Sequence, residues 1–282
     1  PQAETLYNGI LSGQPGNSDA LAGLGDIALR RQQYEAAKGF FEQAIEADPD
    51  NASAYAGLAS AFNGLGMVDQ AIASFESALA ANPQNLQARY ALGLLYAQTG
   101  DYTAAIPHMQ AILEVRPDWD NIRMRLVKAQ EETGAYGAAA DNAIIVLNRN
   151  YDDQTAMYAA QLEAKAGRTS SAVSRLEGVI GSSGNRQAYL LLATVYRDSG
   201  QRSAMQGVFN RLQSAYPGDP TANYMVGSFY YQSGVSKAQV SELTQANIPT
   251  WEAAVNDLNT AIGFLNQVSG YRSSQAQNMV TA

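Results

Sequence analysis

The chain has 282 residues, of which 46% are hydrophobic and 16% charged, so it can bury a core and is not expected to be disordered. Its 26 acidic and 18 basic residues give a net charge of −8, which argues against nucleic-acid binding because that function needs a basic face. The chain has no cysteine and a single histidine, His108, so it can form no disulfide, zinc finger, thiol nucleophile or His-rich metal site. It also lacks the run of about 18 apolar residues that would predict a membrane-spanning helix.

The first predicted element is a helix that ends before residue 18. Ala3, Tyr7 and Ile10 recur at three and four residues, which places them on one helical face, and Pro15 follows. The sequence starts at Pro1 with neither methionine nor a leader-like apolar run. We therefore expect a processed protein or an excised fragment.

The next stretch, 18–51, predicts two consecutive helices. Leu21, Leu24 and Ala28 mark the apolar face of the first helix. After a polar break a second apolar stripe begins at Ala37, and Pro49 ends it because proline lacks the amide hydrogen that a helix interior requires. These residues are typical of a helical hairpin.

The same pattern recurs along the chain with a period of 33 or 34 residues. The prolines of this period are Pro15, Pro49, Pro83 and Pro117. The glycines are Gly66, Gly100, Gly134, Gly167, Gly200 and Gly234. The alanines are Ala37, Ala71, Ala105, Ala139 and Ala172. Because three independent tracks share one period, we predict an array of hairpin repeats.

In the clearest repeats, residues of a defined size fill the same slots. Each of these repeats has, in order, a leucine, a small residue, an alanine and a large apolar residue. They are Leu24, Gly25, Ala37 and Phe41 in the first full repeat, Leu58, Ala59, Ala71 and Phe75 in the second, and Leu92, Gly93, Ala105 and Met109 in the third. This pattern resembles the tetratricopeptide repeat family, whose signature is W-x2-L-G-x2-Y, then A-x3-F, then P, over about 34 residues. The resemblance implies an all-α fold, a right-handed superhelical solenoid of helical hairpins that stack on one another and form a concave inner face.

The later repeats depart from the signature. Tyr151 stands where the proline of the fourth repeat is expected, and the fifth repeat ends in 181–185, a Gly- and Ser-rich run that predicts a flexible joint. The seventh repeat is interrupted after Gly234, where we expect a short helix from Ser236 and a new helix that opens at Trp251. Two interpretations of this interruption remain open: a tolerated loop without a function, and a loop that has a function of its own.

These observations predict three segments. Residues 1–17 are the C-terminal half of a preceding repeat. Residues 18–268 form a seven-repeat solenoid with an insertion at 235–249. Residues 269–282 form a polar tail.

The resemblance also implies where a partner binds, because the first helix of each hairpin lines the concave face in this family. The implied groove positions include Tyr90, Leu94, Arg125, Lys128, Tyr158, Gln161, Thr194, Arg197, Tyr224 and Tyr231. Tyrosine anchors mixed with amides and single charges suit an extended peptide or a partner helix. The alternative, that many of these positions are ordinary solvated helix residues, stays open.

One subtype of the family grips the C-terminal carboxylate of a chaperone with a Lys/Asn/Asn/Lys/Arg set, and this set is missing. Ala22 and Asp26 stand where its first Lys and Asn are needed. Arg125 and Lys128 form the small basic cluster of the predicted groove and could hold a carboxylate. Glutamates follow within one turn, and their neutralisation of this cluster is the favoured interpretation.

We therefore predict a scaffold that is not an enzyme, needs no cofactor or metal, and binds another protein or peptide rather than nucleic acid or a bilayer. Arginine outnumbers lysine 14 to 4, which with the lack of cysteine favours a bacterial protein, exported or periplasmic rather than cytoplasmic. Analogy within the family favours a cell-envelope assembly or export complex. The alternative is a structural protein that self-associates through its solenoid ends. His108 is expected on the surface.

Overall fold

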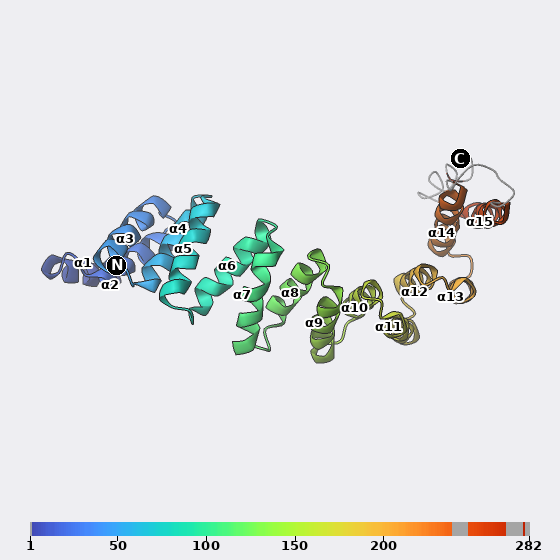
Figure 1. Cartoon of the computed structure of the whole chain (residues 1–282), viewed down its shortest axis with the longest axis horizontal. Coiled ribbons are helices and arrows are strands. Elements are labelled where there is room, and N and C mark those ends of the chain that lie inside the picture. The colour runs from blue at the N-terminus through green and yellow to red at the C-terminus, as the bar shows by residue number, and fades with distance from the viewer. Residues whose placement is uncertain (1, 239–247, 269–278, 280–282) are drawn as a thin grey trace. The chain divides into compact units, whose positions relative to one another are not determined.

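In a computed structural model the chain is helical nearly throughout the residues that the structure describes, 2–238, 248–268 and 279, and no β-strand occurs among them. The chain divides into two compact units, Pro1–Arg149 and Asn150–Ala282. Figure 1 labels the helices in chain order. The predicted all-α solenoid of helical hairpins is confirmed.

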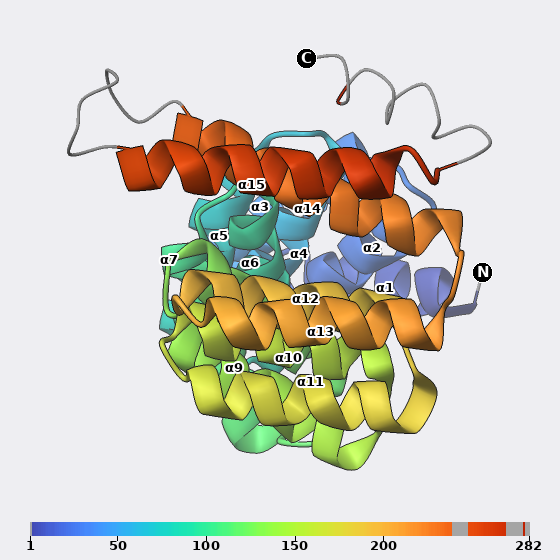
Figure 2. The same ribbon diagram turned by 90° about the vertical axis from the view of Figure 1, so that its right-hand side faces the viewer.

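The helices have the following bounds in chain order: α1 Gln2–Gly13, α2 Ser18–Arg30, α3 Tyr34–Ala47, α4 Ala52–Gly64, α5 Val68–Ala81, α6 Leu86–Gln98, α7 Tyr102–Val115, α8 Asp120–Glu132, α9 Tyr136–Arg149, α10 Asp153–Lys165, α11 Thr169–Ser183, α12 Arg186–Asp198, α13 Arg202–Ala215, α14 Pro220–Ala238 and α15 Ile248–Leu265. In the first unit α1 packs on α2, and the hairpins are α2–α3, α4–α5, α6–α7 and α8–α9. In the second unit the hairpins are α10–α11, α12–α13 and α14–α15 (Figure 2).

Short polar residues and glycines set the ends of these helices. Asn17, Asn51 and Asn85 precede α2, α4 and α6, and each side chain accepts a hydrogen bond of 2.9 to 3.0 Å from the backbone N–H three residues later. Gly66 and Gly100 lie in the tight turn between two helices of a hairpin with φ of +75° and +83°, a left-handed conformation that glycine adopts without strain. The repeat period in the sequence is therefore a period of helix ends.

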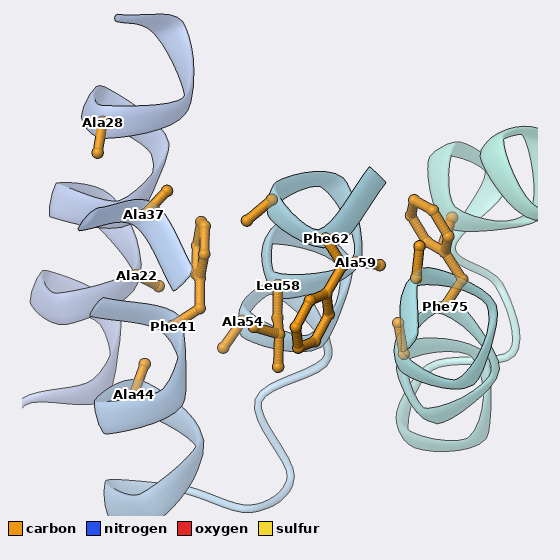
Figure 3. Close-up of a cluster of buried hydrophobic side chains, with 14 of the residues drawn as sticks. Ala22, Ala28, Ala37, Phe41, Ala44, Ala54, Leu58, Ala59, Phe62 and Phe75 are labelled. Atoms are coloured by element: carbon orange, nitrogen blue, oxygen red, sulfur yellow. The ribbon is translucent and has the colours of Figure 1, made fainter. Parts of the chain in front are cut away.

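Phe41 shows how one hairpin packs against the next. Its side chain is completely buried and points from α3 toward α4, among alanines and Leu58 (Figure 3). A Cβ atom at Gly57 would lie 2.2 Å from this ring, and one at Gly25 would lie 2.7 Å from it. Glycine at both positions therefore allows one phenylalanine to fill the space between α2 and α4.

The structure corrects the flexible joint that the sequence predicted at 181–185. Helix α11 continues to Ser183, and Gly184 caps it with φ of +63°. The Tyr216 hydroxyl donates a hydrogen bond to the Gly184 carbonyl, and Asn185 caps α12. The glycine therefore ends a helix in a packed turn, as glycine commonly does.

The interruption of the seventh repeat also differs from its prediction in the residues described. No new helix begins at Ser236, because α14 continues through the buried Gly234 and through Ser236 to Ala238. Helix α15 begins at Ile248 rather than at Trp251, with Pro249 in its first turn, where no amide hydrogen is needed. The middle of the predicted insertion and nearly all of the predicted tail lie outside the described residues.

Candidate partner-binding surface

The ten predicted groove residues all lie on the first helix of a hairpin. Tyr90 and Leu94 are on α6, Arg125 and Lys128 on α8, Tyr158 and Gln161 on α10, Thr194 and Arg197 on α12, and Tyr224 and Tyr231 on α14. Two pairs of first helices from adjacent hairpins contact each other directly, α2 with α4 in the first unit and α10 with α12 in the second. The predicted groove residues Tyr158, Gln161 and Arg197 lie on the second of these pairs.

Tyr90 is held within this surface by a second aromatic ring. It is half-buried and stacks on Trp119, which directly precedes α8, with ring centroids 5.1 Å apart. The Arg116 guanidinium lies over the Trp119 ring, 5.3 Å from its centroid. Trp119 therefore packs over the junction between two repeats, and Tyr90 belongs to the same junction.

The basic cluster on α8 is engaged by its own helix. Lys128 Nζ lies 2.5 Å from a carboxylate oxygen of Glu132 and 3.7 Å from one of Glu131. The hydrogen bond with Glu132 is the main cause of a raised Lys128 pKa. Arg125 Nε donates to the Asn121 side chain at 3.1 Å. Lys128 is thus neutralised locally, whereas Arg125 contacts a neutral amide.

Arg197 joins two hairpins of the second unit. Its Nε lies 2.7 Å from Asp198, and its guanidinium lies 5.2 Å from the centroid of the Phe229 ring on α14. Tyr158, Tyr224 and Tyr231 are half-buried on α10 and α14. These contacts give Arg197 a packing role in addition to any contact with a partner.

A hollow of about 450 Å³ lies between α10 and α12, near the turns that follow these two helices. It is lined by Gln161, Ala164, Lys165, Gly167, Thr169, Leu191, Thr194, Val195, Asp198 and Ser199. Gln161 and Thr194 are the predicted groove residues that the structure brings together here. Its volume is within the range of roughly 300 to 1,000 Å³ that is usual for ligand sites.

The apolar part of this hollow was not singled out in the sequence. Leu191 and Val195 are one turn apart on α12, and Ala164 faces them from α10. Leu191 directly precedes a signature leucine, Leu192, which is fully buried in the hairpin core. The spacing of four residues between Leu191 and Val195 is the signal that could have indicated a second apolar stripe on α12.

His108 corrects another prediction, since it is not a surface residue. It lies on α7, half-buried, with its ring 5.8 Å from that of Tyr96. Its Nδ1 atom is buried without a hydrogen-bond partner among the described residues. Burial is the main cause of its lowered pKa, and Arg89 lowers the pKa further.

Two further features of the described residues concern ligands and membranes. No group of three or more histidine, aspartate or glutamate side chains is placed to hold a metal ion in this part of the chain. None of the helices described is both long and apolar enough to cross a bilayer.

Comparison with family models decides the classification. Models described as tetratricopeptide repeat match residues 1–62, 56–122, 90–153 and 187–219. Together these matches span more than half of the chain. The chain belongs to the tetratricopeptide repeat family. Tetratricopeptide repeat proteins are in general non-catalytic scaffolds for protein–protein interaction, and this chain has the repeat that defines them.

Solved structures of the same fold have low sequence identity to this tetratricopeptide repeat protein. A chain of the Naa15/Naa10 structure bound to HypK-THB is 19% identical with a TM-score of 0.63, and the match covers 98% of this chain but 43% of that one. A tetratricopeptide repeat protein from Parabacteroides merdae is 15% identical with a TM-score of 0.47, over 94% of this chain and 98% of that one. YrrB, a TPR protein with an unusual peptide-binding site, is 17% identical with a TM-score of 0.42, over 77% and 95%. No curated protein sequence gives a match. Of these similarities, the one to the Naa15/Naa10 structure supports the fold, and the fold alone.

Proposed function

We propose that the second unit binds an extended segment of a partner protein along α10, α12 and α14. One apolar side chain of that segment enters the hollow between α10 and α12. The observation that carries this proposal is the hollow itself, which lies on the first helices of adjacent hairpins and combines an apolar wall with polar groups.

The chemistry of the hollow suits a peptide. Leu191, Val195 and Ala164 supply apolar surface that a partner side chain can cover, which is the main source of affinity in such pockets. The Gln161 amide can both donate to and accept from a peptide group, and the Thr194 hydroxyl can do the same. An extended segment has unpaired backbone groups that need such partners. The partner is therefore an extended chain with an apolar anchor residue.

The remaining predicted groove residues have separate roles in this proposal. Gln161 is exposed and contacts the segment directly, with Tyr158 one turn away on the same helix. Tyr224 and Tyr231 extend the surface along α14. On α6 and α8, Tyr90, Leu94, Arg125 and Lys128 form a second surface in the first unit, where Tyr90 has its packing role as well. A place in a bacterial cell-envelope or export complex remains a prediction from composition and family analogy.

The test selects peptides from a random library displayed on phage, with the full chain as bait. We expect the selected sequences to share an apolar residue at one position. For a selected peptide, Leu191→Arg places a charge at the apolar wall and weakens binding by about tenfold or more, and Gln161→Ala by roughly three- to tenfold. Circular dichroism establishes that the variants keep their helix content.

Gln110→Ala is the matched control, because Gln110 is an exposed glutamine on α7, the second helix of its hairpin. It is expected to bind the peptide as the unaltered chain does. Equal affinity of the Leu191→Arg and Gln110→Ala proteins for every selected peptide contradicts the proposal, as does a library that yields no enriched sequence.

A further inference from the structure

Helix α15 has an apolar stripe on the side that faces away from the rest of its unit. Ile248, Val255 and Ile262 are 43%, 52% and 36% exposed. They are seven residues apart, close to two helical turns, so they align along one face of a helix about 27 Å long. The opposite face contains Asp257 and Ala261 and is buried against α14 (Figure 2).

A hollow of about 420 Å³ opens within this stripe. It is lined by Ile248, Trp251, Glu252, Val255 and Asn256. The first four of these are at positions i, i+3, i+4 and i+7, the four residues that form the hole for an inserted side chain when two helices pack as a coiled coil. The indole nitrogen of Trp251 is buried without a hydrogen-bond partner in the described residues.

We propose that the occupant of this face is α15 of a second copy of the chain, in an antiparallel pair about a two-fold axis. When two α15 helices overlap fully, the axis passes between Asn256 and Asp257, the midpoint of the helix. The heptad register then places Ile262 of the second copy in the hollow between Ile248 and Val255.

The same register fills the next hole along the stripe. Val255 of the second copy enters the hole formed by Val255, Leu258, Asn259 and Ile262 of the first. A two-fold pair requires one surface patch that is complementary to itself. A stripe with equal intervals on either side of Val255 meets this requirement, because it presents similar side chains in both directions.

Charge does not oppose a second copy at this end of the chain. Glu252 faces Asn259 and Gly263 of the second copy, an amide donor and an exposed glycine. The two Glu252 carboxylates are offset by about 13 Å along the helix axis, so like charges do not face each other. Residues 150–282 contain nine acidic and nine basic residues, so the second unit has a net charge of zero. The second units of two copies therefore do not repel each other through their net charge.

Sedimentation velocity of the full chain over a range of concentrations tests the pairing. We expect a monomer–dimer equilibrium that Ile262→Glu and Val255→Glu each shift to monomer, without loss of helix content, because a carboxylate is then buried in the seam. Leu6→Glu is the matched control, since Leu6 is 63% exposed on α1, and it leaves the dimer intact. A monomer at every concentration overturns the proposal. Loss of association in Leu6→Glu, or growth of polymers beyond the dimer, overturns it in favour of stacking through the solenoid ends.

Single cysteines test the antiparallel register, because the chain has no cysteine of its own. The register offsets two residues at position 255 by about 4 to 5 Å along the axis and two at position 248 by about 25 Å. Val255→Cys is therefore expected to form a disulfide-linked dimer on mild oxidation, and Ile248→Cys is not. Cross-linking of both variants indicates a parallel pair and overturns the register, as does cross-linking of neither.

Discussion

The regular and the irregular repeats of this chain use different buried contacts between their two helices. In the first hairpins, glycine, alanine and phenylalanine fill the interior, with Phe41 as the clearest example. In the repeats that depart from the signature, the fifth and the seventh, a buried carboxylate joins the two helices. Glu163 is 3% exposed and pairs with Arg175 through two bonds of 2.9 Å, and Asp257 is 2% exposed.

The buried carboxylate of Asp257 on α15 contacts three polar side chains. It accepts a hydrogen bond of 2.6 Å from Ser233 and pairs with Lys237, both on α14, and with Arg202 on α13. In the fourth repeat the buried polar group is a cation instead, because Arg123 on α8 is 8% exposed and donates a hydrogen bond of 2.9 Å to the Asn142 side chain on α9. Among the described residues, the buried charged side chains Arg123, Glu163 and Asp257 thus occur where the pattern of small and aromatic residues weakens, and one fold is stabilised in two ways.

The overall charge follows the division into units. Residues 1–149 contain 17 acidic and 9 basic residues, whereas residues 150–282 contain 9 of each. The whole net charge of −8 therefore belongs to the first unit. The basic residues of the second unit include those that pair with buried Glu163 and Asp257.

The largest effect is expected from Phe41→Ala in a regular repeat. Loss of a fully buried ring leaves a cavity between α3, α2 and α4 and lowers the free energy of unfolding by about 3 to 5 kcal/mol. Urea denaturation followed by circular dichroism measures the change. A loss under about 1 kcal/mol contradicts the packing role assigned to this ring.

Glu163→Gln is expected to cost less, about 2 kcal/mol, because Arg175 is left buried in part without its carboxylate but keeps some contact with water. The double variant Glu163→Leu with Arg175→Leu sharpens the comparison. It replaces the ion pair with apolar contacts of the kind found in the regular repeats and is expected to recover most of the loss. If the double variant is less stable than Glu163→Gln, the two kinds of contact are not equivalent.

A smaller effect comes from His108, whose folded pKa is lowered by burial. The unfolded chain then binds a proton more readily, so the contribution of His108 to stability is complete above the ordinary histidine pKa of 6.5 and declines as the pH falls toward the folded value. The groups that face it are Tyr96, whose pKa burial raises to about 12, together with Arg89 and Glu76. Thermal melts below pH 6.5 should show a steeper loss for the unaltered chain than for His108→Gln. Parallel curves for the two proteins contradict this assignment.

The smallest effect is expected from Glu4→Gln, the matched surface variant for Glu163→Gln. Glu4 pairs with Arg31 at 2.6 Å, but both side chains are well exposed to water. Water and salt screen such pairs, so the unfolding midpoint should not change measurably. If Glu4→Gln lowers the unfolding midpoint as much as Glu163→Gln does, burial does not explain why the ion pair of Glu163 stabilises the chain more.

The sequence predicted the helices well because the residues that end them recur with the period. Pro49 and Pro83 follow α3 and α5 by two residues, and Gly66 and Gly100 adopt the left-handed turn. The short helix from Ser236 and the flexible joint at 181–185 are wrong predictions, because composition alone does not separate a glycine in a loop from a glycine against a packed helix. The side chain of Leu258 on α15, which is distant in sequence, decides the matter for Gly234.

The candidate site was predictable only in part. Helical periodicity places Gln161 and Thr194 on first helices, and the structure brings them into one hollow. The hollow itself depends on how far α10 and α12 lie apart and on which side chains leave the space between them open. Leu191 and Asp198 line the hollow because of this spacing between the helices. Neither residue occupies a position of the repeat signature, so the sequence pattern does not indicate them.

The central claim is that no hairpin is stable without its neighbours. Hydrogen exchange measured by mass spectrometry on Phe41→Ala tests it most directly, because the ring contacts glycines on α2 and α4. The account predicts faster exchange in α2, α3 and α4 together. Faster exchange confined to α3, with α2 and α4 as protected as in the unaltered chain, would contradict it.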